Sequence, residues 1–396
     1  MRKGILLLGA GLVAMSCCQC SQKSEEVMTA SGLNPAKFVA EYRGDSTALY
    51  VLKNANGMEV CITNFGGRIV SMMVPDRDGK MQDVVLGFDS IQAYYPENNL
   101  TDFGATIGRY ANRINQGKFT LDNVEYQLPQ NNYGHCLHGG GEMGDLGWQY
   151  RVFKVESATD STLVLTLDSP DGDNGFPGNV VATVNFKLLA DNTLDINYSA
   201  TTDKPTIINM TNHSYFNLSG NPETPITESE LTVNASNFTP VDSTFMTSGE
   251  ILPVEGTPMD FRQAKLIGAD IEKYDYIQLK NGNGYDHNWV LDNALDSVPA
   301  KGNPGDFSKV AATLYCPANG IAMDVYTDEP GIQVYSGNFL DGTVTGKHSI
   351  TYNFRTGIAM ETQHYPDSPN KPAWPSVVLR PGETYNSHTA MKFSVK

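Results

Sequence analysis

Basic residues are scarce in this sequence of 396 residues. It contains 28 Lys and Arg against 44 Asp and Glu, which gives a formal net charge of −16 and a pI near 4.8. Binding to nucleic acid requires clusters of Lys and Arg that neutralise phosphates. The composition therefore argues against a nucleic-acid partner, and an acidic surface of this kind mainly keeps a protein soluble.

Cysteine is also infrequent, with six residues in the chain. Three of them lie near the N-terminus, and the other three are Cys61, Cys136 and Cys316. An odd number of widely spaced cysteines indicates neither a disulfide framework nor a CxxC metal site. We expect these three side chains to be small, buried and apolar in behaviour.

The N-terminal segment lacks the length of apolar chain that a permanent membrane helix needs. Its apolar run, residues 4–13, follows Arg2 and Lys3, and a short run with these flanks is typical of a cleaved signal peptide. The next residues, Ala14-Met15-Ser16-Cys17, resemble a bacterial lipobox. We predict a lipoprotein signal peptide over residues 1–16, lipidation at Cys17, and a polar, flexible tether over residues 17–34.

This N-terminal prediction leaves alternatives open. Lipoboxes usually carry Leu at the position of Ala14, and Cys18 and Cys20 are neighbouring candidates for the modified residue. Secretion without lipid and a retained membrane helix are the other two interpretations. The lipid-anchored interpretation places the protein in a bacterial cell envelope, in the periplasm or on the outer membrane.

Helical periodicity is missing from residue 35 onward, and strand patterns dominate instead. Apolar residues alternate with polar ones over residues 184–188 and 194–198, with a turn between them, so this pair predicts a hairpin. Residues 321–325 alternate likewise, and Glu329-Pro330-Gly331 then turns the chain into residues 332–334. We predict an all-β fold, one large antiparallel β-sandwich over residues 35–396.

Three strand-like segments place polar residues opposite apolar ones. Asn209, Thr211 and His213 share one face of the first segment, while Ile208 and Met210 face the other way. By the same alternation, Glu361 faces away from its apolar neighbours in residues 357–361, and Gln333 faces away from Ile332 and Val334. A row of His, Asn and Thr without Lys or Glu favours the lining of a cleft over a solvated face.

Nine short motifs together resemble one family, the aldose 1-epimerases or galactose mutarotases. A single motif would be weak evidence, but these occur in the family's order over nearly all of the chain after about residue 40. They are residues 83–88, 107–114, 137–140, 169–172, 212–218, 285–288, 335–339, 361–363 and 379–383. The departures are the lipoprotein-like leader and Val334, since an aromatic residue often follows the glutamine.

The resemblance implies a galactose-mutarotase-like β-supersandwich and two catalytic residues. His213 would be the general acid and Glu361 the general base in the interconversion of the α and β anomers of free aldohexoses such as galactose and glucose. Contacts to sugar hydroxyls would come from Asn112, Arg113, His138, Ser214, Tyr215, Asp286 and Gln333.

The chemistry explains the choice of His and Glu. The base removes the proton of the C1 hydroxyl while the acid protonates the ring oxygen; rotation about C1–C2 and the reverse steps then give the other anomer. From unperturbed pKa values of about 4.3 for Glu and about 6.5 for His, we expect an ionised Glu361 and a protonated His213. The acidic limb of the pH profile should then belong to Glu361 and the alkaline limb to His213.

This reaction requires no cofactor, and we expect a monomer whose partner is the sugar alone. The pair His135 and His138 has no evident third metal ligand, so no catalytic metal is predicted. Residues 171–175 resemble part of a calcium loop but lack its closing Glu, so a turn is favoured and a structural Ca²⁺ is the open alternative.

Two other functions remain as alternatives. One is a non-catalytic carbohydrate-binding lipoprotein on the same fold, although a pure binder has no need of an acid–base pair. The other is a glycoside hydrolase or lyase that uses Glu361. A hydrolase needs a second carboxylate across the scissile bond, for which only Asp286 is suitable.

Overall fold

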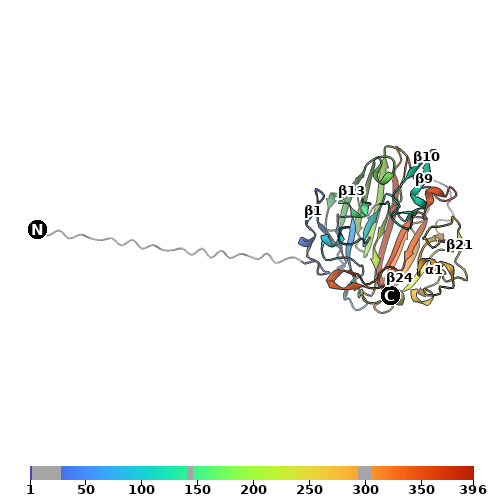
Figure 1. The fold of residues 1–396 in the computed structure, drawn as a ribbon. Helices are drawn as coiled ribbons and strands as arrows, with labels where there is room; N and C mark the ends of the chain where they lie inside the picture. Colours follow the sequence, from blue (N-terminus) through green and yellow to red (C-terminus); the bar gives the residue numbers. More distant parts are fainter. Residues whose placement is uncertain (2–27, 141–145, 293–304) are drawn as a thin grey trace.

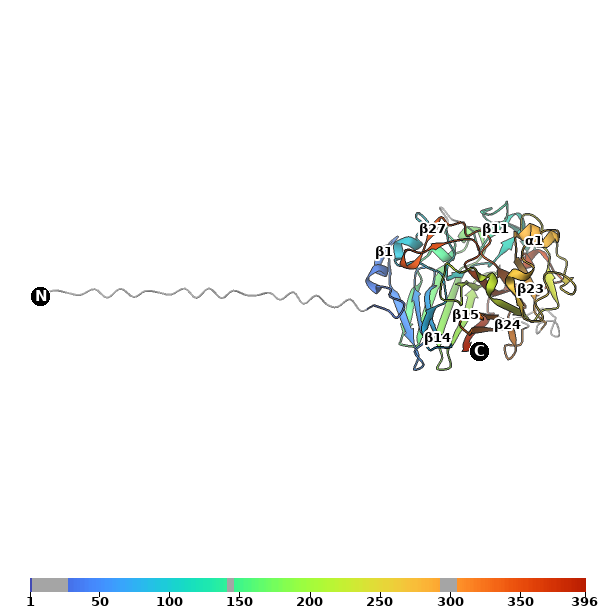
Figure 2. The same ribbon diagram turned by 90° about the horizontal axis from the view of Figure 1, so that it is seen from below.

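A computed structural model describes Met1 and residues 28–140, 146–292 and 305–396 of the chain. Figure 1 shows long strands crossing the middle of the molecule, and the turned view in Figure 2 shows β14 beside β15. The largest sheet has nine antiparallel strands in the order β12-β13-β14-β15-β31-β25-β24-β19-β22. In that order they span Lys154–Ala158, Thr162–Ser169, Val180–Leu188, Thr193–Thr202, Tyr385–Val395, Ile321–Thr327, Val310–Tyr315, Glu230–Val233 and Lys265–Leu266.

Two smaller sheets complete the framework. A six-stranded sheet has the order β18-β29-β26-β23-β20-β21, and a four-stranded sheet runs from β3 to β6. The six strands are Tyr215–Phe216, Ile358–Gln363, Gly331–Tyr335, Asp286–Val290, Asn237–Thr239 and Leu252–Pro253. The four strands are Leu49–Lys53, Glu59–Thr63, Arg68–Pro75 and Met81–Asp83.

Short strand pairs and helical turns connect these sheets. The pairs are β1–β2 (Ala40–Tyr42, Asp45–Thr47), β7–β17 (Ala105–Ile107, Thr211–His213), β8–β11 (Arg113–Ile114, Cys136–Leu137), β9–β10 (Lys118–Leu121, Val124–Gln127), β16–β30 (Thr206–Ile207, Val378–Leu379) and β27–β28 (Val344–Thr345, Thr351–Tyr352). In the described part of the chain, α1 (Ile277–Gly282) is the one α-helix. The 3-10 turns are Pro35–Phe38, Ile91–Tyr94, Asn115–Gly117, Trp148–Tyr150, Asp173–Gly175, Ile226–Glu228, Ile267–Ala269, Lys347–Ser349 and Ser368–Asn370.

One hydrophobic core joins the three large sheets. Val184 and Ile196 from the nine-stranded sheet, Ile62 from the four-stranded sheet, and Ile332 and Met360 from the six-stranded sheet belong to the same buried cluster. The alternation seen in the sequence places one side of each strand in this core. The prediction of an all-β sandwich is confirmed.

Two details of the sequence-based interpretation are also confirmed. Strands β14 and β15 form the expected hairpin, with Leu188 opposite Leu194. The three cysteines in the body of the chain are free and buried.

The turn at Glu329-Pro330-Gly331 carries the chain from β25 in the nine-stranded sheet to β26 in the six-stranded sheet. Gly331 is needed there, because a Cβ atom would collide with the Asn288 amide.

The segment of residues 206–215 differs from the single strand that its alternation suggested. It forms three short strands, β16, β17 and β18, which pair with β30, β7 and β29 respectively. The predicted side-chain directions still hold in these shorter strands: Ile208 and Met210 lie in the hydrophobic core. The segment thus ties three parts of the fold together at the position of His213.

Within the described residues, no helix has the length and hydropathy to cross a membrane. Residues 2–16 of the proposed signal peptide, Cys17 and residues 18–27 of the proposed tether lie outside the described residues. The prediction of a flexible tether was wrong for residues 28–34, because Leu33 is buried in a hydrophobic cluster and the Ala30 N–H donates to Glu59 Oε1 at 2.7 Å.

Candidate active site

The six-stranded sheet provides one row of polar side chains. Gln333 on β26 is paired with Glu361 on β29 and with Asn288 on β23. Asp286 lies two residues before Asn288 on the same strand, and its Oδ1 accepts a 2.7 Å hydrogen bond from the Gln333 amide. The apolar neighbours on these strands, Ile332, Val334, Ile358 and Met360, lie in the core on the other side. The predicted facing of Gln333 and Glu361 is confirmed.

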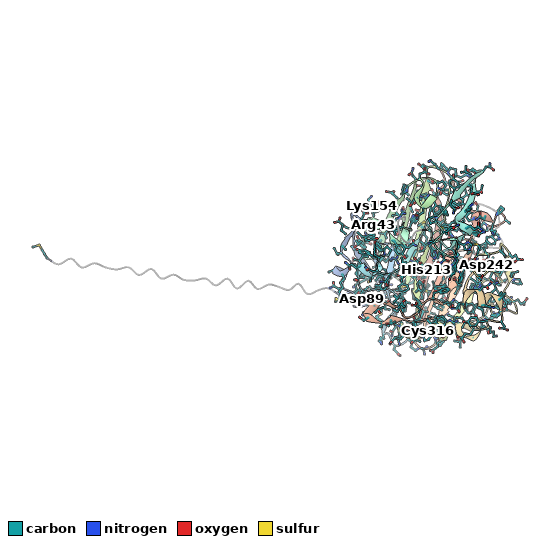
Figure 3. The ribbon with its side chains drawn as sticks, viewed as in Figure 1. Arg43, Asp89, Lys154, His213, Asp242 and Cys316 are labelled. Carbon is teal, nitrogen blue, oxygen red and sulfur yellow. The ribbon has the colours of Figure 1, made fainter. Side chains whose placement is uncertain are left out.

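His213 approaches this row from β17. Its Nε2 lies 3.4 Å from Oε1 of Glu361, and the two side chains are only 6% and 2% exposed. The imidazole stacks on the Tyr215 ring at 5.0 Å between centroids and an interplanar angle of 19°. Figure 3 shows His213 near the middle of the molecule in this view. The structure therefore brings the two predicted catalytic residues together.

Asn212 holds the backbone around His213 in place. Its amide nitrogen donates to the Gly104 carbonyl at 2.8 Å, and its Oδ1 accepts hydrogen bonds from the backbone N–H and hydroxyl of Ser214. Ser214 is 1% exposed, and its hydroxyl is engaged with Asn212. The structure thus places Ser214 in the support of the site, and its predicted contact to sugar stays a prediction.

The paired strands β8 and β11 bring Asn112, which precedes β8, and His138, which follows β11, to the same place. The backbone N–H of Asn112 donates to Nδ1 of His138 at 3.2 Å, and the N–H of His138 donates to the Asn112 carbonyl at 2.9 Å. Both residues have positive φ angles, 61° and 53°, so this reciprocal pair holds them in a left-handed conformation. The His138 ring meets the His213 ring edge-on at 5.1 Å.

Arg113 supplies the positive charge of the site. Its Nε donates to Asn132 Oδ1 at 3.1 Å, and its guanidinium lies 4.9 Å from the centroid of the Phe245 ring. The Arg113 charge lowers the pKa of Asp286 and of Glu361, although burial raises both by more. Among the residues predicted to contact sugar, Asn112, Arg113, His138, Tyr215, Asp286 and Gln333 therefore surround the His213–Glu361 pair.

Burial sets the protonation of the catalytic pair. It raises the pKa of Glu361 well above its ordinary value, and the nearby carboxylates of Asp286 and Asp102 raise it further. Burial also lowers the pKa of His213 to about 3, with a smaller contribution from Arg68. Both shifts favour the neutral forms of the two side chains. These directions run against the expected ionised Glu361 and protonated His213, because unperturbed pKa values leave out desolvation.

His138 presents a proton to the site. Because its Nδ1 accepts the Asn112 N–H, the neutral ring carries its hydrogen on Nε2. Burial and the neighbouring His213 and Arg113 hold the pKa of His138 well below its ordinary value, so the ring stays neutral. A neutral imidazole of this tautomer donates a hydrogen bond and does not accept a proton.

Asp102 is a site residue that sequence reasoning missed. One of its carboxylate oxygens and one ring nitrogen each of His138 and His213 lie within 4.8 Å of one another. Two histidines and a carboxylate suit Zn²⁺ in general. A ligating histidine, however, donates its second N–H outward, whereas His138 receives a hydrogen bond on Nδ1, which leaves Nε2 without a free lone pair. The residues do not fit a metal centre in this arrangement.

The segment that resembles a calcium loop has its carboxylates engaged with cations. Asp173 forms an ion pair with Arg151 at 2.6 Å, and Asp171 forms one with Lys204. Gly172 and Asn174 adopt positive φ angles in a tight turn. Residues 171–175 therefore form a turn, as the sequence favoured.

The site is a buried acid–base pair on a large β-sandwich, and comparison with known proteins identifies the family. The sequence model of the aldose 1-epimerases matches residues 48–392. The chain belongs to the aldose 1-epimerase family. It is 38% identical to galactose mutarotase from Rattus norvegicus over 338 residues, which cover 85% of this chain and 92% of the relative.

Other relatives agree in sequence and fold. Identity to aldose 1-epimerase from Escherichia coli is 38% over 352 residues, covering 88% of this chain and 96% of the relative. The crystal structure of an aldose epimerase homologue from C. elegans superimposes with a TM-score of 0.75 at 30% identity, covering 88% of this chain and 99% of that one. Galactose 1-epimerase from Lactobacillus acidophilus gives a TM-score of 0.75 at 28% identity, covering 90% and 97%. The predicted galactose-mutarotase-like fold is confirmed.

Proposed function

We propose that this protein is an aldose 1-epimerase, an isomerase that interconverts the α and β anomers of free aldohexoses such as galactose and glucose. The observation that carries this proposal is the buried pair of His213 Nε2 and Glu361 Oε1, 3.4 Å apart. A non-catalytic sugar-binding protein has no need of such a pair, so the enzymatic interpretation is favoured. The named relatives, galactose mutarotase and aldose 1-epimerase, support the same choice.

The pair operates with a single shared proton. In the form that opens the ring, His213 carries the proton and Glu361 is ionised. Glu361 takes the proton of the C1 hydroxyl, His213 donates its proton to the ring oxygen, and the C1 carbonyl forms as the ring C–O bond breaks. This step ends with a neutral Glu361 and a neutral His213, which is the form that burial favours. After rotation about C1–C2, the reverse transfers close the ring as the other anomer, and no net proton is gained or lost.

The surrounding residues would orient the sugar. Asp286, fixed by the Gln333 amide, accepts from hydroxyls, whereas Arg113 and the His138 Nε2–H donate to them. Both proton transfers are accounted for by His213 and Glu361, so we propose that the reaction needs no cofactor or metal.

We also propose that the protein is a bacterial lipoprotein, with residues 1–16 as a cleaved signal peptide and a lipid on Cys17. The support is the order of basic, apolar and lipobox-like residues in the sequence. The enzyme would then act as a monomeric domain in the cell envelope, tethered by residues 17–27, because residues 28–34 are packed against the domain through Leu33 and Ala30. Sugars that enter the envelope would be its substrates.

Polarimetry tests the proposed activity. Freshly dissolved α-galactose and α-glucose change their optical rotation slowly in buffer, and the wild-type protein should accelerate this change. The matched control is the Glu361→Gln, His213→Asn double variant, which keeps the approximate shape of both side chains. Equal rates with wild type, double variant and buffer would overturn the proposal.

A further inference from the structure

The loop that carries Asp102 is held rigidly beside the acid–base pair. The buried guanidinium of Arg68 donates to the carbonyls on both sides of Asp102, Thr101 O at 3.1 Å and Phe103 O at 2.9 Å. The carbonyl of Asp102 accepts the backbone N–H of Ala105 at 3.0 Å. Because Ala105 is paired with His213 across β7 and β17, the position of this carboxylate is fixed relative to His213.

The carboxylate of Asp102 is directed toward the site but is not satisfied there. Its Oδ1 is buried and, among the described residues, has no hydrogen-bond partner. The same is true of His213 Nδ1, Gln333 Oε1 and Glu361 Oε2. A buried carboxylate oxygen without a partner is costly, and native structures normally supply one. A carboxylate oxygen of Asp102 lies within 4.8 Å of a ring nitrogen of His213, which is 3.4 Å from Glu361, and Glu361 is paired with Gln333. A polar ligand bound beside these residues would supply the missing partners.

The charges around this point define the ligand's chemistry. Asp102 is accompanied by the carboxyl groups of Asp286 and Glu361; burial raises their pKa values, and any of the three that is ionised would repel an anionic ligand. Carboxylate, amide and imidazole groups together match a neutral molecule with several hydroxyls. Asp102 Oδ1 can only accept while it is ionised, so its partner is a donor such as a sugar hydroxyl.

We propose that Asp102 is a further substrate-binding residue, whose carboxylate accepts a hydrogen bond from one hydroxyl of the bound aldose, beside His138 and His213. This inference rests on the proposed function, because the hydroxyl belongs to the sugar that His213 and Glu361 convert. It adds a specificity element: an aldose in which this hydroxyl is absent or inverted leaves Asp102 unpaired and reacts more slowly.

A panel of deoxy sugars tests the inference. Rates of anomer exchange are measured for galactose and its 2-, 3-, 4- and 6-deoxy derivatives with wild type, Asp102→Ala and Asp102→Asn. For one of these deoxy sugars, the loss in kcat/KM relative to galactose should be about 10- to 100-fold larger with wild type than with Asp102→Ala. This is the range expected for a hydrogen bond to a charged group. Asp78→Ala, which removes an exposed carboxylate, is the matched control and should keep the wild-type pattern.

The pattern across sugars separates binding from support. If Asp102 only shapes its loop, the Asp102→Ala substitution lowers kcat/KM for every sugar by the same factor, and the inference is wrong. If Asp102→Ala does not fold, Asp102→Asn keeps the shape and removes the charge, and it should reduce the discrimination against the same deoxy sugar. An unchanged discrimination in Asp102→Asn would then overturn the inference. Failure of the proposed function is recognised separately, because wild type would then not accelerate exchange of galactose itself.

Discussion

The Glu361→Gln substitution should have opposite effects on activity and on stability. Gln has nearly the shape of a protonated Glu but cannot take the proton of the C1 hydroxyl. Loss of a general base costs about 10²- to 10⁴-fold in rate. At 1.36 kcal/mol per factor of ten, this corresponds to about 2.7–5.4 kcal/mol in the activation free energy.

The stability effect follows from the buried position of Glu361. Its pKa is raised in the folded state, chiefly by burial, so folding is favoured most below the unfolded pKa of about 4.3. As the pH rises above that value, the unfolded chain releases this proton while the folded chain retains it, and the free energy of unfolding decreases until the folded pKa is passed. The glutamine side chain introduced by Glu361→Gln does not titrate, so the variant escapes this loss.

The assay combines polarimetry with thermal unfolding at several pH values. Glu361→Gln should lose anomer exchange and have a Tm equal to or above that of wild type, with a difference that grows from pH 4 to pH 8. Glu223→Gln is the control, because Glu223 is exposed and should change neither quantity. A variant that exchanges anomers at the wild-type rate, or whose Tm falls below wild type at pH 8, would refute the reasoning.

Three further predictions follow from the site and the N-terminus. The pH profile of kcat/KM should be bell-shaped. Activity should be lost below about pH 3, where His213 binds a second proton for the pair, and on the alkaline side, where Glu361 releases the shared proton. His213→Asn should remove the acidic limb, and a profile with its acidic limb near pH 6.5 would contradict this assignment. Arg113→Lys should lower kcat/KM by about 10- to 100-fold, mainly by raising KM, because Lys lacks the guanidinium group that binds Asn132 and stacks on Phe245. Steady-state kinetics on galactose measure this effect, and an unchanged KM would contradict the prediction. Cys17→Ser should move the protein from the membrane fraction to the soluble envelope fraction, and intact-mass analysis of wild type that finds Met1 or an unlipidated Cys17 would contradict the lipoprotein proposal.

Local alternation was enough to predict much of the site. Glu361 and Gln333 follow from period-two patterns on strands β29 and β26, because each has apolar neighbours that must face the core. The family resemblance supplied Asp286, Arg113 and His138, which no periodic pattern marks.

Other features depend on contacts between distant parts of the chain. Asp102 lies in a loop without periodicity, and it reaches the site only because β7 pairs with β17. The neutral state of His213 and Glu361 arises from burial among several sheets, which no single segment specifies. The division of residues 206–215 into three strands likewise reflects three different partners.

The central claim is that this chain exchanges the anomers of a free aldose through His213 and Glu361. Magnetisation-transfer NMR on galactose at anomeric equilibrium measures that exchange directly, because saturation of the α-anomeric proton passes to the β-anomeric proton only if the two interconvert. Wild-type protein should produce this transfer at pH 7, and Glu361→Gln should reduce it by at least about 100-fold. Transfer no greater than in protein-free buffer, or equal transfer in the two proteins, would contradict the account.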